Sequence, residues 1–157
     1  MEFLGWLEGT SYAGWVAASL WGWAIMLSLH AIGIAAIVGI VFVVSFRLLG
    51  LYKTIPCASL SKYLKIAWYG VVLNVITGLS IFTTQATYYI TSLPFLLKIT
   101  FIVFGCVNIA YMQKVLKTDS GKWDTAKVTP TLGLVLAGSS MLFWTMAVIT
   151  GRLIAYM

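Results

Sequence analysis

The sequence predicts an all-α integral membrane protein, a four-helix bundle preceded by an N-terminal interfacial helix. Of the 157 residues, 61% are hydrophobic and 9% are charged, whereas a soluble domain carries about 25% charged residues to face water. A water-soluble fold of this composition would expose large apolar patches. Because four spans of about 20 residues or more with short loops use the whole chain, we expect residues 1–157 to form a single transmembrane domain.

The N-terminal segment, residues 2–20, is expected to lie in the membrane interface. Glu2 and Glu8 differ from the basic start of a cleavable signal peptide. The apolar side chains between them share one face of a short amphipathic helix. Thr10 or Ser11 can cap a second helical start, because a hydroxyl oxygen accepts a hydrogen bond from a free N–H of the first turn.

A break must separate this segment from the first span. The apolar pattern runs from residue 11 to residue 52, and a single helix of that length would measure about 63 Å, twice the hydrocarbon thickness. We expect the break near Gly22 and predict the first span over residues 22–50. Three tryptophans mark its boundary as an aromatic belt: Trp15, Trp21 and Trp23.

The three remaining spans are predicted over residues 62–84, 94–117 and 130–156. Pro94 and Pro130 open the last two, because proline is preferred in the first turn of a helix. The polar stretch between these two spans is expected to be a loop.

The basic residues predict an orientation. Loops rich in Lys and Arg stay in the cytoplasm, so both termini are expected on the periplasmic side of a bacterial inner membrane. No basic stretch carries the interleaved aromatic residues that bind nucleic-acid strands, and we expect no nucleic-acid partner. Eight of the ten basic residues lie around the loops after the first and third spans: Arg47, Lys53, Lys62, Lys65, Lys114, Lys117, Lys122 and Lys127.

His30 is the one histidine, and it lies inside the first span. An ionisable side chain is costly in a bilayer and is therefore a candidate for function. A neutral imidazole is a good ligand for haem iron or copper, and Met26, one turn earlier, could face the same site. The alternative is a packed histidine hydrogen-bonded to a neighbouring helix. One histidine cannot supply a bis-histidine pair within one chain.

Lys98 and Arg152 are the other ionisable residues near the outer ends of spans. Their long stems can carry the charge to the headgroups. Alternatively they neutralise an anion between helices, such as a haem propionate or a lipid phosphate. With His30 and Met26 they form the predicted cofactor site.

Small residues and amides at four-residue spacing predict close helix packing. Small side chains let two helices approach, and an amide can form a hydrogen bond across the contact. The residues expected at these contacts are Ala35, Gly39, Gly70, Asn74, Gly78, Gly105, Asn108, Gly133 and Ala137.

Several stretches resemble a family of small bacterial four-helix membrane proteins of unknown function. They are LEGTSYAGW, LHAIGIAAIVG, FRLLGL, VITGLSIF, YYITSLPFLLK and GRLIAY, in the same order along nearly the whole chain. Ser45 stands where that family commonly has Asp, and a family histidine near Tyr111 and Met112 is missing. More distantly, the LH…G…RLLG segment is similar to copper-resistance membrane domains and to small haem-binding oxidases of porphyrin metabolism. That likeness implies haem b or, less favoured, copper.

The function predicted first is a non-catalytic accessory subunit that packs against a larger membrane complex or self-associates. The alternative is a haem b- or copper-binding protein with His30 as ligand. No Asp or Glu lies within a predicted span, which disfavours a transporter with carboxylate relays. Asp119 and Asp124 fall in the predicted loop, where capping or solvent exposure accounts for them. No nucleophile stands beside an orienting base, so an enzyme is not expected.

Overall fold

The computed structural model describes residues 2–125 and 130–156, and over those residues it contains helices and no strand. Four of the helices are long and apolar enough to cross a membrane: α3, α4, α6 and α7. The predicted all-α four-helix membrane bundle is therefore confirmed. The elements are α1 (Glu2–Glu8), α2 (Ser11–Ala18), α3 (Leu20–Leu48), α4 (Cys57–Phe82), α5 (Ala86–Thr91), α6 (Leu93–Thr125), α7 (Thr131–Leu153) and the 3₁₀ turn η1 (Ile154–Tyr156).

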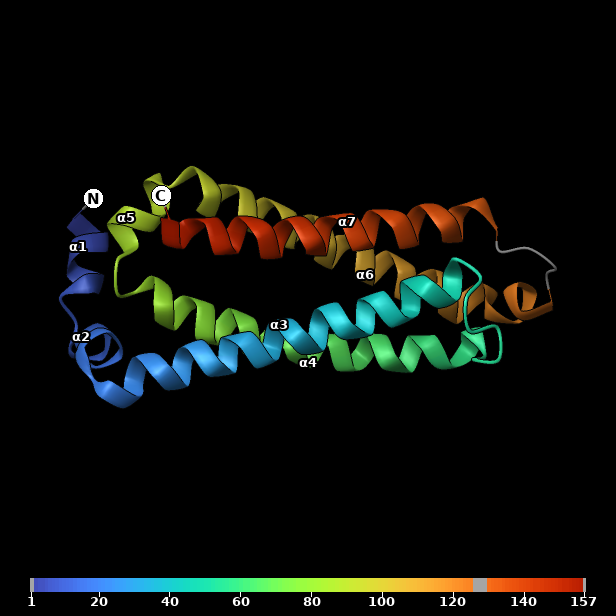
Figure 1. Cartoon of the computed structure of the whole chain (residues 1–157), viewed down its shortest axis with the longest axis horizontal. Coiled ribbons are helices and arrows are strands. Elements are labelled where there is room, and N and C mark those ends of the chain that lie inside the picture. The colour runs from blue at the N-terminus through green and yellow to red at the C-terminus, as the bar shows by residue number, and fades with distance from the viewer. Residues whose placement is uncertain (1, 126–129, 157) are drawn as a thin grey trace.

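The four long helices run along one another, and both chain ends lie at the same end of the bundle (Figure 1). We call this the termini end, and it also carries α1, α2 and α5. The opposite end, which we call the loop end, carries the connections from α3 to α4 and from α6 to α7 (Figure 1). The two ends differ in packing: the loop end is filled with side chains, and the termini end contains a cavity.

The break before the first span occurs at Ser19, three residues before the predicted position. Its hydroxyl oxygen accepts a 2.7 Å hydrogen bond from the N–H of Gly22, which caps α3. In the same way Thr10 caps α2 by accepting from the N–H of Ala13 at 3.2 Å. Of the two predicted caps, Thr10 is therefore the one that is used, and two separate short helices precede the first span.

At its other end α3 stops in a Schellman turn. Gly50 has φ +96°, a conformation that glycine adopts without steric penalty. The N–H of Leu51 bonds to the carbonyl of Phe46 at 3.0 Å, and the N–H of Gly50 bonds to the carbonyl of Arg47 at 3.1 Å. These two bonds satisfy the last carbonyls of the helix and turn the chain back toward α4.

The third span is part of a longer helix than predicted. The sequence predicted an end at Lys117 and a loop beyond it, but α6 continues to Thr125. Trp123 explains the extension, because its side chain packs against the buried core. Asp124 is therefore a helical residue and not a loop residue. Tertiary packing here overrides the weak helix preference of the polar residues.

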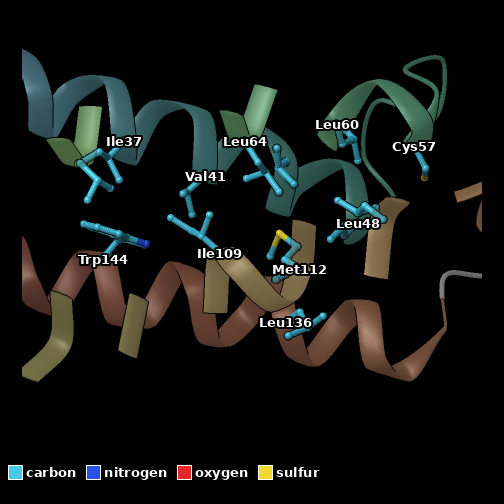
Figure 2. Packing of buried hydrophobic residues seen from close by; sticks show 14 residues of the cluster. Ile37, Val41, Leu48, Cys57, Leu60, Leu64, Ile109, Met112, Leu136 and Trp144 are labelled. Atoms are coloured by element: carbon cyan, nitrogen blue, oxygen red, sulfur yellow. The ribbon is translucent and has the colours of Figure 1, made fainter. Parts of the chain in front are cut away.

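The core of the bundle lies toward the loop end and is shared by the four long helices (Figure 2). The inner face of α3 contributes Ile37, Val41 and Leu48 at helical spacing. The side chains that pack against this face come from the other three helices and are Leu60, Leu64, Ile109, Met112, Leu116, Leu136 and Trp144.

A close helix contact joins α3 and α4 at Gly33 and Gly70. A Cβ at Gly70 would lie 2.9 Å from Ile37 Cγ1 and 3.1 Å from the Gly33 carbonyl, and a Cβ at Gly33 would overlap the Asn74 amide. Asn74 donates to the His30 carbonyl at 3.2 Å across this contact. Gly70 and Asn74 thus lie where the sequence predicted close packing.

Ala35 and Gly39 do not pack between helices, contrary to the prediction. Both are exposed, and a Cβ at Gly39 would meet no atom within 4 Å. The face of α3 that approaches α4 carries Gly33 and Ile37, and the predicted pair lies two residues further round the helix. These small residues therefore face the lipid.

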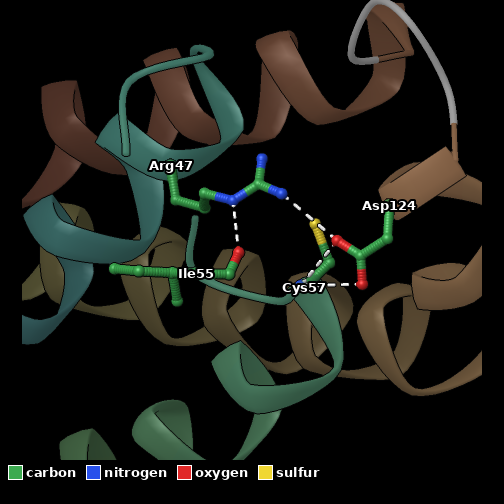
Figure 3. Close-up of polar contacts among 4 residues, drawn as sticks. All are labelled: Arg47, Ile55, Cys57 and Asp124. Carbon is green, nitrogen blue, oxygen red and sulfur yellow. Dashed lines mark hydrogen bonds and ion pairs between the residues drawn. The ribbon is translucent and has the colours of Figure 1, made fainter. Parts of the chain in front are cut away.

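A polar cluster joins three segments at the loop end (Figure 3). Buried Arg47 donates from Nε to the Ile55 carbonyl and from Nη2 to Asp124 at 3.2 Å. The Asp124 oxygens accept from the N–H of Cys57 at 2.8 and 3.0 Å. Because α4 begins at Cys57 without a side-chain cap of its own, α6 supplies its cap. This explains why α4 starts five residues before the predicted span.

The ionisation of Asp124 matters for this cluster. Burial raises the pKa of the carboxyl, but the Cys57 N–H and the Arg47 charge outweigh burial and hold the pKa below its ordinary value. The carboxylate is therefore charged at neutral pH and is a strong acceptor for the helix N-terminus.

Gly33→Ala is expected to destabilise the bundle by about 1–3 kcal/mol, because the added methyl group displaces Asn74 and overpacks the contact. Gly39→Ala is the matched control on the same helix. A Cβ there meets nothing, and we expect equal or slightly higher stability. Unfolding of both variants in a mild detergent titrated with dodecyl sulfate measures the difference. Equal destabilisation of the two variants would contradict the Gly33 contact.

Asp124→Asn is expected to lower stability by about 1–2 kcal/mol at pH 7, because the amide keeps an acceptor for Cys57 but loses the charge that faces Arg47. The pKa of folded Asp124 lies below its ordinary value. Its contribution is therefore complete above about pH 4, the ordinary range of aspartate, and is lost as the pH falls through the folded pKa. Melting temperatures of the two proteins should differ at pH 7 and converge in acid. A difference that persists at pH 2 would contradict the ion pair.

Candidate functional site

A cavity of about 550 Å³ lies between the long helices toward the termini end. Its lining comes from α3, α4, α6 and α7 and includes Ile90 of α5. The lining is mainly apolar. Its ionisable side chains are His30 and Lys98, which the sequence had singled out separately and the fold brings into one cavity. This cavity is the candidate site.

The hydrogen bonds around His30 define its tautomer. Thr77 has one hydroxyl proton, and it is donated to the Leu73 carbonyl at 2.8 Å. With that proton so placed, the 2.9 Å contact between Thr77 Oγ1 and His30 Nδ1 is satisfied by the tautomer in which Nδ1 is the donor. Nε2 consequently carries a free lone pair, and no donor to it occurs among the residues that the structure describes. That atom can accept a hydrogen bond or bind a metal.

The position of the His30 ring is set by α4. Asn74 holds the His30 backbone through the 3.2 Å bond to its carbonyl. Gly78 leaves room for the ring, since a Cβ there would lie 3.3 Å from His30 Cε1. Asn74, Thr77 and Gly78 together form the surface of α4 against which the imidazole rests. The small-residue pattern in this span thus shapes the site as well as the helix contact.

Lys98 places a cation in the same cavity. Its stem crosses α7 at Gly151, where a Cβ would lie 3.4 Å from Lys98 Cδ and Cε and 3.6 Å from Nζ. Within the described residues, neither a carboxylate nor a hydrogen-bond acceptor faces the ammonium. A partly buried charge without a counter-ion is unfavourable, and an anionic group in the cavity would relieve it.

Met26 and Arg152 do not share the cavity with these two residues. Neither belongs to its lining, and Arg152 is exposed near the end of α7. Met26 lies one turn before His30 and is outside the space that the ring borders. The predicted four-residue cofactor site is therefore reduced to His30 and Lys98. Depth in the membrane, which grouped the four residues in the sequence, does not specify which helix face each occupies.

Of the remaining predicted packing residues, Gly105 and Asn108 lie between α6 and α7. A Cβ at Gly105 would lie 2.8 Å from the Trp144 ring, so the indole rests directly on this glycine. Asn108 donates to Ser139 at 2.6 Å. Gly133 and Ala137 are buried on α7.

Sequence reasoning missed two residues of the site. Thr77 selects the His30 tautomer, and its signal was its position three residues after Asn74 on the same helix face. Trp144 lines the cavity on the side toward the core, and its buried indole N–H has no partner in the described part of the chain. A tryptophan in the middle of a span, away from the interfacial belts, was the signal for it.

A site made of protein ligands for a bare metal ion does not occur in the described residues, since they hold no group of three or more His, Cys, Asp and Glu side chains. His30 alone offers one ligand. This donor set does not fit a copper ion held by side chains, and it can serve a metal that brings most of its own ligands, as a porphyrin does.

Thr77→Val is expected to abolish the preference for the Nδ1–H tautomer, because the hydroxyl acceptor is lost. His30 is the one histidine in the chain, so ¹⁵N-histidine labelling gives its two ring nitrogens without overlap. The wild-type spectrum should show a protonated Nδ1 and an unprotonated Nε2. Thr100→Val, at an exposed threonine that also lines the cavity, should leave it unchanged. A protonated Nε2 in the wild type would contradict the assignment.

Comparison with known proteins adds no relative: no family model, no curated protein and no solved structure matches the chain. The resemblance to small bacterial four-helix membrane proteins therefore stays a prediction. The function has to be argued from the cavity and the residues that line it.

Proposed function

We propose that this multi-pass membrane protein binds haem b in the cavity, where His30 would bind the iron and Lys98 would pair with an acidic group of the haem. The observation that carries the proposal is the free Nε2 lone pair of His30 in the same apolar cavity as an unpaired lysine. The resemblance of the LH…G…RLLG segment to haem-binding membrane domains supports the same ligand.

The residues present fit this group. Cavities of about 300–1,000 Å³ are typical of small-molecule and cofactor sites, and this one measures about 550 Å³. Metal-binding histidines usually donate their second ring N–H to a fixed acceptor, and Thr77 fills that role for His30. An apolar lining suits a porphyrin face, and Lys98 offers a charge for one acidic edge.

The lining would supply one iron ligand from this chain, His30. Met26 lies outside the cavity, so His30 is the residue of this lining that would bind the iron. When bound, the haem would supply redox or ligand-binding chemistry at its iron. His30 would orient the group and exclude rotation of its own ring, while the apolar lining would keep water away from the bound face. This arrangement suits storage, transfer or sensing better than six-coordinate electron transfer.

For the membrane setting, we propose a bacterial inner membrane with both termini on the periplasmic side, supported by the basic residues around the loop end. The site would then lie in the periplasmic leaflet. The accessory-subunit function stays a prediction. The exposed apolar side chains of the four spans suit lipid and a partner subunit equally well.

Titration of the detergent-purified protein with haemin tests the proposal. We expect a shifted Soret band at one haemin per chain. His30→Ala should weaken binding at least tenfold. Lys98→Met keeps the stem but removes the charge, and it should weaken binding roughly tenfold, about 1.4 kcal/mol.

Met26→Ala and Arg152→Gln are the matched controls, because the structure places both side chains outside the cavity. Both should bind haemin as the wild type does. Equal binding by the wild type and His30→Ala would sink the proposal. Elution of the chain with stoichiometric membrane proteins and without a Soret shift would favour the accessory-subunit function instead.

A further inference from the structure

The cavity has an opening between α4 and α6. Six of its lining residues are also exposed: Val75 and Leu79 on α4, Leu96, Ile99 and Thr100 on α6, and Ile90 on α5. Leu79 is 60% exposed and Leu96 is 46% exposed. Five of the six belong to α4 and α6, so this part of the wall is the one with the most exposed lining side chains. We call the opening between α4 and α6 the lateral mouth and define it by its four aliphatic side chains, Val75, Leu79, Leu96 and Ile99.

The lateral mouth faces lipid. Its four side chains are apolar and belong to two helices that are long and apolar enough to span the membrane. Water gains no hydrogen bond from such a rim, whereas acyl chains make ordinary van der Waals contact with it. The surroundings that reach the cavity through this opening are therefore the hydrocarbon of the leaflet nearest the termini end.

In the part of the chain that the structure describes, the side-chain hydrogen bonds that join α4 and α6 lie near the loop end. Near the loop end, Trp68 donates to Gln113 at 3.3 Å, and Gln113 donates to the Ser61 carbonyl at 3.2 Å. Toward the termini end the two helices diverge (Figure 1). Among the described residues, no hydrogen bond joins them along the lateral mouth. The interface there consists of aliphatic contacts, which lipid can replace without loss of hydrophobic burial.

The termini end of the cavity is covered by aromatic side chains and by α5, whose Ile90 lines the cavity and is itself exposed. Phe82, Tyr89 and Phe95 stack over this end of the cavity, with ring centroids 5.5–6.2 Å apart. Glu8 of α1 accepts from the hydroxyl and the N–H of Thr87 at 2.6 and 2.7 Å, which fixes α5 above the rings. We call this assembly the roof. Opening it would break charged hydrogen bonds and an aromatic stack, whereas the lateral mouth is already open.

We propose that the ligand reaches the cavity sideways, from the lipid phase through the lateral mouth, and not from water through the roof. The inference rests on the proposed function, because its test uses haem as the probe. It assigns a chemical class to the ligand: an amphiphile that partitions into the bilayer and carries an acidic group for Lys98. Haem b belongs to this class, since it combines a large apolar ring with carboxylates.

Stopped-flow mixing of haemin with the protein in phosphatidylcholine nanodiscs tests the route, with the Soret change as the readout. Val75→Trp and Leu79→Trp narrow the lateral mouth. Each should slow binding and release at least fivefold, with a dissociation constant that changes less than threefold. Val72→Trp is the matched control, since it lies on the same helix and is exposed but outside the lining. It should leave both rates unchanged.

Glu8→Ala loosens the roof and should not accelerate binding. Faster binding in Glu8→Ala, together with unchanged rates in Val75→Trp and Leu79→Trp, would overturn the lateral route while leaving haem binding intact. Absence of a Soret change in the wild type would instead overturn the proposed function, and the haem route with it. The two failures are therefore distinguishable.

Discussion

The contact of α3 with α4 at Gly33 and Gly70 is the constraint on which the rest of the structure depends. In a bilayer the apolar surfaces of two helices gain little by leaving lipid, so close backbone approach and interhelical hydrogen bonds hold them together. The two glycines permit the approach, and the Asn74 amide bonds across it to His30. Once this pair is fixed, the His30 ring has one place to lie, against Thr77 and Gly78 of α4.

The second pair of helices, α6 and α7, is held together by different contacts. Gly105 lies against the Trp144 indole, and Asn108 donates to Ser139. Two pairs built this way meet over a filled core toward the loop end and over a hollow toward the termini end. The Arg47–Asp124–Cys57 cluster fastens the filled end, and the divergence of α4 and α6 then creates the space in which His30 and Lys98 meet. The packed loop end thus stabilises the bundle, and the termini end contains the candidate binding site.

The sequence predicted the features that depend on composition and local chemistry. Hydropathy alone identified four spans, and the scarcity of ionisable residues within them pointed to His30 and Lys98. It did not predict which faces meet: Ala35 and Gly39 have the right spacing but look toward lipid, while Gly33 makes the contact. The extension of α6 was missed because Trp123 and Asp124 favour a helix only when the core and the end of α4 are beside them. The grouping of Met26 and Arg152 with His30 failed because depth along a helix says nothing about its rotation.

The cap that Asp124 provides for α4 has a consequence for synthesis. The carboxylate lies 67 residues after the N–H group that it accepts from, so α4 leaves the ribosome and enters the membrane before its cap has been made. Until α6 follows, the first turn of α4 depends on water or headgroups for its free N–H groups. α6 is therefore translated after α4 but supplies the N-terminal cap of α4.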